Sequence, residues 1–104
     1  MALRVRVCRI DEVSPGDHRG FAVAGVAWPI LIANLDGRLV ATAGVCPHED
    51  VELADGELRG QRIRCPGHSY EFDLVTGRCA HDARLQLARY RVEVISGEVW
   101  VELI

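Results

Sequence analysis

The chain lacks an excess of positive charge and a recognisable catalytic constellation. Its 104 residues contain no lysine, so all twelve basic residues are arginine, and fifteen acidic residues bring the formal net charge to −3. That balance argues against nucleic-acid binding. The sequence also lacks a nucleophile–base–acid set, a phosphate-binding loop and the ligand triad of a mononuclear iron enzyme. These absences disfavour a catalytic function.

No apolar run is long enough to span a membrane. The longest, residues 21–33, is interrupted by Gly25 and Pro29, whereas a spanning helix needs about 20 apolar residues. The N-terminus alternates apolar and basic residues and lacks the apolar region of a secretory signal peptide. We therefore expect a cytoplasmic protein with no membrane partner. Since thiols stay reduced there, its four cysteines indicate metal binding before disulfides.

Two short motifs each combine a cysteine with a histidine. Cys46-Pro47-His48 has the pattern C-x-H, Cys65-Pro66-Gly67-His68 has the pattern C-x-x-H, and sixteen residues separate them. Two thiolates and two imidazoles form a complete ligand set for a soft metal centre. The proline in the first motif stiffens its turn because the ring fixes φ, and Pro66-Gly67 is a turn-forming pair.

Two kinds of metal centre are compatible with this ligand set. In a zinc site all four ligands meet one ion, but the usual zinc-finger spacing keeps like ligands together. In a Rieske [2Fe–2S] centre two cysteines hold one iron and two histidines hold the other. Because each motif here mixes one cysteine with one histidine, each turn can supply one ligand to each iron. The spacing favours the cluster, and zinc stays open as the alternative.

The two motifs and the residues that follow them resemble those of small soluble Rieske ferredoxins. The similarity continues through Phe72-Asp73, Thr76-Gly77, Leu87, Tyr90-Arg91-Val92 and residues 97–101, so it covers nearly the whole chain. The four candidate ligands are the specific part of this resemblance.

The resemblance implies both a cofactor and a function. Cys46, His48, Cys65 and His68 would bind a Rieske [2Fe–2S] cluster. The protein would be a one-electron carrier and not an enzyme, taking electrons from a flavin-dependent reductase and passing them to a terminal oxygenase. The alternatives are a zinc-binding structural or regulatory subunit, and a Rieske accessory subunit that never leaves a larger redox complex.

Short alternating segments separated by glycine turns, with no convincing helix, predict an all-β fold, a sandwich or small barrel. The resemblance implies one domain, residues 1–104, with a small cluster-binding subdomain inserted at about residues 44–73. We expect strands at residues 3–10, 21–26, 29–34, 39–43, 69–73, 87–95 and 99–103, with short strands at most around Leu58 and Ile63. We also expect a D-G hairpin turn at Asp36-Gly37 and a turn at Ser96-Gly97. In the first strand, alternation places Cys8 on the face of Arg4 and Arg6.

Cys79-Ala80-His81 is a second C-x-H motif. It has no partner motif, so we predict that Cys79 and His81 are not ligands. Cys79 could pair with Cys8, but only the fold determines whether their Cβ atoms are close enough for a disulfide.

The segment between the two motifs is acidic, with carboxylates at Glu49, Asp50, Glu52, Asp55 and Glu57. One interpretation is a solvated loop, whose carboxylates pair with the arginines that follow. The other is a docking surface beside the metal centre, where charge would steer a partner.

Overall fold

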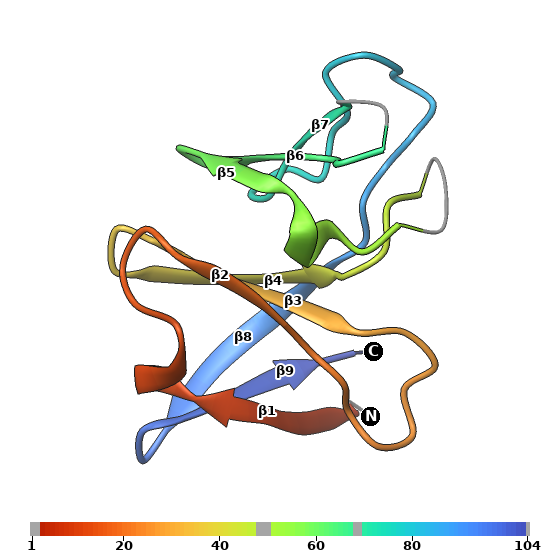
Figure 1. Ribbon diagram of the computed structural model, residues 1–104. Helices are drawn as coiled ribbons and strands as arrows, with labels where there is room; N and C mark the ends of the chain where they lie inside the picture. Colours follow the sequence, from red (N-terminus) through yellow and green to blue (C-terminus); the bar gives the residue numbers. More distant parts are fainter. Residues whose placement is uncertain (1–2, 48–50, 68–69, 104) are drawn as a thin grey trace.

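The computed structural model describes residues 3–47, 51–67 and 70–103, which form two antiparallel sheets (Figure 1). The large sheet has the strand order β1-β9-β8-β4-β3-β2, and the small sheet the order β5-β6-β7. The strands are β1 (Arg4–Arg9), β2 (His18–Phe21), β3 (Ile30–Leu35), β4 (Arg38–Ala43), β5 (Glu57–Arg59), β6 (Arg62–Arg64), β7 (Glu71–Asp73), β8 (Arg89–Ile95) and β9 (Glu98–Glu102). Two 3-10 turns, η1 (Ile10–Glu12) and η2 (Leu53–Asp55), are the only helical segments of the described residues. The all-β prediction is confirmed.

The hairpin turns of the large sheet form at residues that accept positive φ. Asp36 and Gly37 join β3 to β4 with φ of 55° and 100°, and Ser96 and Gly97 join β8 to β9 with φ of 52° and 77°. Positive φ at both central residues matches the twist of the flanking strands. Both turns were predicted from the sequence and are confirmed.

Strand β3 lies between the two hydrophobic cores and contributes side chains to both. Ile30 and Ile32 pack into the core inside the curled large sheet, together with Val99 and Val101. Leu31 and Ala33, on the opposite face, pack into the core beneath the small sheet. A strand that is buried on both faces needs an unbroken apolar run, which is what residues 30–33 provide.

The first strand departs from simple alternation. The register of β1 against β9 shifts between Arg6 and Cys8, and such a bulge turns the following side chains to the other face. Cys8 is consequently buried in the core of the large sheet, 2% exposed. The expectation that it shares the face of Arg4 and Arg6 is wrong, because one inserted residue changes the strand's parity.

The second strand lies earlier in the chain than predicted. It covers His18–Phe21 and pairs with β3, whereas residues 22–29 form a connecting loop. The apolar residues of that loop, such as Val23 and Val26, still pack on the core of the large sheet. Their hydrophobicity reflects burial of a loop, which apolar content alone does not distinguish from a strand.

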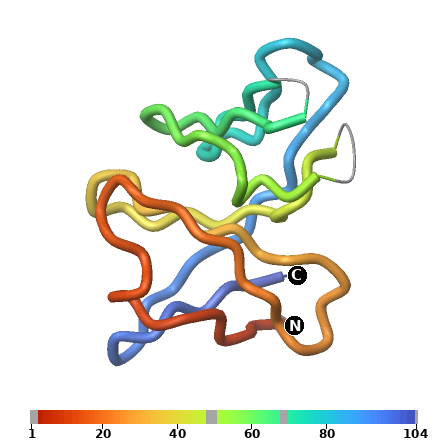
Figure 2. The backbone as a smooth tube through the Cα atoms, viewed as in Figure 1, coloured from red at the N-terminus to blue at the C-terminus, as the bar shows by residue number. Residues whose placement is uncertain are grey.

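The chain ends lie close together. The Leu103 N–H donates to the Leu3 carbonyl at 2.7 Å, and Figure 2 shows both ends near the loop that connects β2 to β3. No helix in the described part of the chain is long and apolar enough to cross a bilayer.

The small sheet sits above one face of the large sheet (Figure 1). His18 of β2 links the two, since its Nε2 lies 3.2 Å from the Ala54 carbonyl and 3.0 Å from the Gly56 carbonyl. The core between the sheets contains Leu53, Ile63, Phe72 and Leu74, all at most 1% exposed. This packing fixes where the chain leaves β4 and β6, and therefore where the two cysteine motifs lie.

Candidate metal centre

Two loops with the same closure carry the two cysteine motifs. After β4, the Cys46 N–H donates to the Val51 carbonyl at 2.9 Å; after β6, the Cys65 N–H donates to the Tyr70 carbonyl at 2.7 Å. In each case the cysteine opens the loop and a carbonyl five residues later closes it. Each closed loop spans one of the candidate histidines in the sequence.

The two cysteines lie in one core. Cys46 and Cys65 are 2% and 1% exposed, and both belong to the hydrophobic cluster beneath the small sheet. Neither forms a disulfide. The other two candidate ligands, His48 and His68, lie outside the described residues, so the structure brings together the cysteine half of the predicted ligand set.

These residues fit a soft metal centre. Thiolate sulfur is the ligand of iron–sulfur and zinc sites, and two uncrosslinked cysteines meet here in one buried core. Their amides are already held by the loop closures, so the sulfurs are presented from a fixed backbone. A purely structural core would not need two thiols at the openings of two matching loops.

Two glycines allow the backbones to come close beside these loops. A Cβ on Gly44 would lie 2.7 Å from the Pro29 carbonyl oxygen, and one on Gly56 would overlap the Arg64 carbonyl oxygen. A side chain at either position would therefore push the two backbone segments apart. Gly44 therefore lets the backbone before Cys46 pass close to Pro29. Gly56 lets the end of η2 pass close to Arg64, the residue before Cys65.

The remaining C-x-H motif lies beside the second loop. Cys79 is 7% exposed in the core that holds Cys46 and Cys65, while His81 stacks on Tyr70. Within the described residues, no three histidine, cysteine or acidic side chains are grouped closely enough to hold a metal ion. Cys8 is buried in the other core, and both cysteines are free, so no disulfide joins Cys8 to Cys79.

Two carboxylates of the acidic segment lie beside the second loop. Asp55 and Glu57 line a groove of about 290 Å³ with Arg64, Cys65 and Pro66. Glu57 pairs with Arg59 at 2.7 Å, and that hydrogen bond lowers the pKa of the Glu57 carboxyl. Part of the segment is therefore a solvated ion pair, as one interpretation predicted, and part lies beside the candidate centre.

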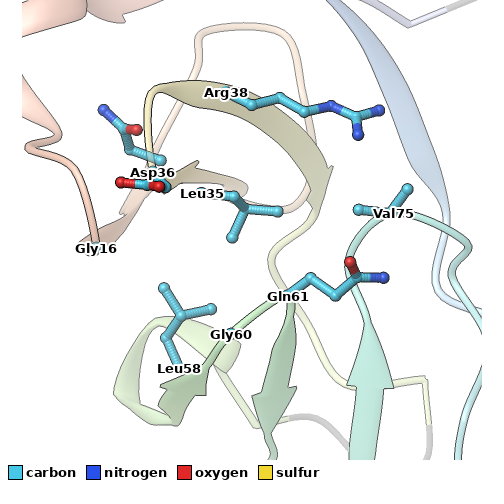
Figure 3. A pocket seen from close by; sticks show the side chains of 9 residues that line it. Gly16, Leu35, Asp36, Arg38, Leu58, Gly60, Gln61 and Val75 are labelled. Atoms are coloured by element: carbon cyan, nitrogen blue, oxygen red, sulfur yellow. The ribbon is translucent and has the colours of Figure 1, made fainter.

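Another groove lies away from both loops. It has a volume of about 420 Å³ and is lined by residues of the β3–β4 and β5–β6 turns, among them Leu35, Leu58 and Gln61, with Val75 (Figure 3). None of its lining residues belongs to a cysteine motif. Figure 1 shows these turns on the side of the molecule opposite the ends of β4 and β6 that lead into the two loops. This groove does not contribute to the candidate metal centre.

The profile of the Rieske [2Fe–2S] domain family matches residues 4–91. This match includes both loops and most of both sheets. The chain belongs to the Rieske [2Fe–2S] family. The resemblance drawn from the two motifs is confirmed, and so is the Rieske cluster as the cofactor of the family.

Several relatives of this Rieske protein are oxygenase ferredoxins. Ferredoxin CarAc of Metapseudomonas resinovorans is 33% identical over 98 residues, 93% of this chain and 91% of that protein. The ferredoxin component of a naphthalene 1,2-dioxygenase system from Pseudomonas aeruginosa is 32% identical over 94 residues, 88% of each chain. A solved complex of reduced oxygenase and oxidized ferredoxin in carbazole 1,9a-dioxygenase contains a chain with a TM-score of 0.86 and 32% identity, covering 95% of this chain and 92% of that one.

The two loop closures were not found from the sequence. They are backbone hydrogen bonds, which leave no residue pattern beyond the equal spacing of Cys46 to Val51 and Cys65 to Tyr70. The stack of Tyr70 and His81 was also missed. Its only signal was the leftover C-x-H motif, which carried no prediction beyond the absence of metal binding.

Proposed function

We propose that this protein is a one-electron carrier, the ferredoxin component of a bacterial oxygenase system. The observation that carries the proposal is the pair of matching loops, each opened by a buried cysteine of one shared core. The relatives support it, because ferredoxin components of dioxygenase systems align with nearly the whole chain. Carrier function suits a protein whose family cofactor is bound without an accompanying catalytic constellation in the sequence.

Four residues are proposed to hold the cluster. Cys46 and Cys65 bind one iron, and His48 and His68 bind the other. The burial of both cysteines supports the first pair, and the position of each histidine within a closed loop of the sequence supports the second. When bound, such a cluster accepts and releases one electron. The loops would hold the two cysteine ligands through the hydrogen bonds that the Cys46 and Cys65 amides donate.

Two proteins are proposed as partners. A flavin-dependent reductase supplies the electron, which accords with the naming of relatives as components of multi-protein systems. A terminal oxygenase receives it, and the carbazole complex shows that a ferredoxin of similar sequence docks onto such an oxygenase. Asp55 and Glu57 beside Cys65 would favour a basic partner surface, with attraction that weakens as salt screens it.

The whole chain, residues 1–104, is proposed to act as one domain. Its cluster-binding subdomain covers about residues 44–73, which includes both loops and the small sheet. Strand β3 supports a single domain, because one face of this strand packs into each of the two cores. We place the protein in the cytoplasm, where its four cysteines, which form no disulfide, stay reduced.

Spectroscopy of the purified protein tests this function. The expected result is a brown-red protein that bleaches on reduction and then gives a Rieske EPR signal. Cys46→Ser, Cys65→Ser, His48→Ala and His68→Ala should each abolish that signal. Cys79→Ser and Cys8→Ser are the matched controls and should retain it. A colourless protein with one zinc per chain would establish the zinc-binding alternative instead.

Electron transfer tests the carrier role separately. With a reductase and oxygenase of a dioxygenase system supplied in excess, the oxygenase should turn over only when this protein is present. Turnover at low ionic strength should exceed turnover at high ionic strength, because exposed charges are screened over about 8–10 Å. A protein with the Rieske signal that supports no turnover, yet copurifies with a larger complex, would be an accessory subunit.

A further inference from the structure

The segment after β7 lies alongside that strand. Phe72 and Cys79 form an isolated antiparallel bridge. The Asp73 N–H donates to the Arg78 carbonyl at 2.8 Å, and the Ala80 N–H donates to the Glu71 carbonyl at 2.9 Å. Residues 78–80 are thus fixed along the whole of β7, and the residue that follows them is delivered to the start of that strand.

That following residue, His81, interacts with the start of β7 in two ways. Its ring stacks on the ring of Tyr70, with centroids 5.4 Å apart and planes 12° from parallel. Its Nδ1 accepts the backbone N–H of Glu71 at 3.3 Å. Because Nδ1 is the acceptor, the proton of the neutral imidazole is on Nε2.

The stacked residue is the one that closes the second ligand loop. The Tyr70 carbonyl accepts the Cys65 N–H at 2.7 Å. The His81 imidazole therefore contacts two neighbouring residues: it stacks on the ring of Tyr70, which closes the loop, and it accepts the backbone N–H of Glu71. If Tyr70 moves away from Cys65 while residues 78–80 stay paired with β7, the stack, the hydrogen bond from Glu71, or both must break.

We propose that His81 is a positioning residue that keeps the second ligand loop closed, and so slows loss of the cluster and limits its contact with water. The inference rests on the proposed cluster at this loop. It assigns the leftover C-x-H motif a role: Cys79 packs in the core and His81 holds the loop from outside. An aromatic stack and a hydrogen bond each change an equilibrium by roughly fivefold.

Three variants separate the stack from the hydrogen bond. His81→Ala removes both, His81→Phe keeps a stacking ring without the acceptor, and His81→Asn keeps an acceptor without the stacked ring. Arg84→Ala is the matched control, because Arg84 lies in the same segment, is 88% exposed and pairs with Asp82 at 3.0 Å. All four proteins are purified with their cluster, and iron release to an excess of chelator is followed by the loss of visible absorbance.

The expected order of release rates follows from whether a variant removes the stack, the hydrogen bond or both. His81→Ala should release iron roughly 25-fold faster, and His81→Phe and His81→Asn roughly fivefold faster each. Arg84→Ala should stay within about twofold of wild type. Amide hydrogen exchange of the holoprotein should rise over residues 65–71 in the same order, which locates the change in the second loop.

The reduction potential distinguishes this role from a general loss of stability. Reduction adds negative charge to the cluster, and water stabilises charge, so an opened loop should shift the potential upward in His81→Ala. The shift should be smaller in His81→Phe and His81→Asn. Arg84→Ala removes a positive charge, so any shift it causes should be downward.

Several outcomes overturn the inference. If wild type shows the Rieske signal but His81→Ala keeps the wild-type release rate and potential, His81 does not hold the loop. An Arg84→Ala effect as large as that of His81→Ala has the same meaning. If His81→Ala does not fold, His81→Phe and His81→Asn decide, since both must release iron faster. A wild-type protein without the signal would instead refute the proposed function.

Discussion

The large and small sheets of this protein obtain their order in different ways. The large sheet has six strands of four to seven residues, with tight hairpin turns between β3 and β4 and between β8 and β9, and an aliphatic core that includes Ile32 and Val101. The small sheet has three strands of three residues each. Its core contains three of the four cysteines, Cys46, Cys65 and Cys79. Backbone pairing is extensive in the first sheet and minimal in the second.

From this difference we infer that the small sheet depends on the metal centre that Cys46 and Cys65 are proposed to bind. Strands of three residues bury too little surface to be stable alone, and metal binding adds free energy directly to folding where no preformed site exists otherwise. Of the two faces of β3, one packs on a core without candidate metal ligands and the other on a core that includes Cys46 and Cys65. We therefore expect the stability of the large sheet to depend on the core on one face of β3, and cluster binding to depend on the core on the other face.

Removal of the cluster should produce the largest difference in order between the two sheets. In Cys65→Ser, or in wild type stripped of iron, we expect the small sheet to lose its order while the large sheet persists. Amide hydrogen exchange should accelerate at least about a hundredfold over residues 57–64, since an unpaired three-residue strand offers little protection. Residues 89–95 and 98–102 should keep slow exchange.

The control for this experiment is Cys79→Ser, which alters the same core without removing a proposed ligand. It should leave the exchange pattern of the holoprotein close to that of wild type. Slow exchange retained at Ile63 and Phe72 in the stripped protein would show that the small sheet is stable without a metal, contrary to the comparison.

A matched pair of core truncations should have the next largest effect. Leu74 and Ile32 are 1% and 0% exposed, the first in the core of the small sheet and the second in that of the large sheet. Truncation of either to alanine should cost about 2–5 kcal/mol. Leu74→Ala should speed iron release at constant temperature, whereas Ile32→Ala should lower the denaturation midpoint and leave iron release nearly unchanged. Equal iron-release rates in the two variants would mean that the cores are not independent.

The sequence predicted the metal chemistry better than the strand boundaries. Cysteine and histidine spacing is local and specific, so the two motifs sufficed for the family and its cofactor. The hairpin turns at Asp36-Gly37 and Ser96-Gly97 were equally local and were predicted for the same reason. In the metal-binding motifs and in the hairpin turns alike, the residues that determine the structure are neighbours in the sequence.

The errors arose where one tertiary contact overrides a local pattern. Cys8 turns inward because a bulge against β9 changes its parity, and alternation within residues 3–10 contains no sign of it. Residues 22–26 are apolar because a loop packs on the core, not because they form a strand. The interactions that close the ligand loops are backbone hydrogen bonds, which single-sequence patterns do not encode.

The turn that follows β7 should show a smaller effect with a distinct pH dependence. Asp73 Oδ1 accepts the N–H groups of Val75 at 2.8 Å and Thr76 at 3.0 Å, and its Oδ2 accepts Gln61 Nε2 at 2.7 Å. Partial burial raises the pKa of the Asp73 carboxyl, but these hydrogen bonds outweigh it and the pKa is lowered. The stabilisation is therefore present above the unfolded pKa of about 3.9 and is lost as pH falls through the folded pKa.

Asp73→Asn should destabilise the holoprotein by about 1–2 kcal/mol at pH 7, measured by urea unfolding at several pH values. The difference from wild type should shrink as pH falls from about 4, where the carboxyl of the unfolded chain becomes protonated, through the lower pKa of the folded protein. Asp36→Asn, at the β3–β4 turn of the large sheet, is the control and should show no comparable loss. A difference that stays constant from pH 7 to pH 3 would assign the effect to shape and not to charge.

The smallest effect should come from the buried thiol of the large sheet, and only at alkaline pH. Burial raises the pKa of Cys8 to about 11, and the carboxylate of Glu12 adds to this, while Arg6 and Arg19 oppose it. Because the folded pKa lies above the unfolded value of about 8.5, the protonated thiol stabilises the fold below that value. This contribution is lost as pH rises from about 8.5 through about 11.

Thermal unfolding of the large sheet at several pH values tests this prediction. In wild type the unfolding midpoint should fall across this pH window. In Cys8→Ala the fall should be shallower, and at pH 7 the variant should differ only by a constant offset. Glu12→Gln should complete its decline at a lower pH than wild type, because the folded-state pKa of the thiol drops without the carboxylate. Parallel profiles for wild type and Cys8→Ala above about pH 8.5 would show that another group controls the alkaline stability of the large sheet.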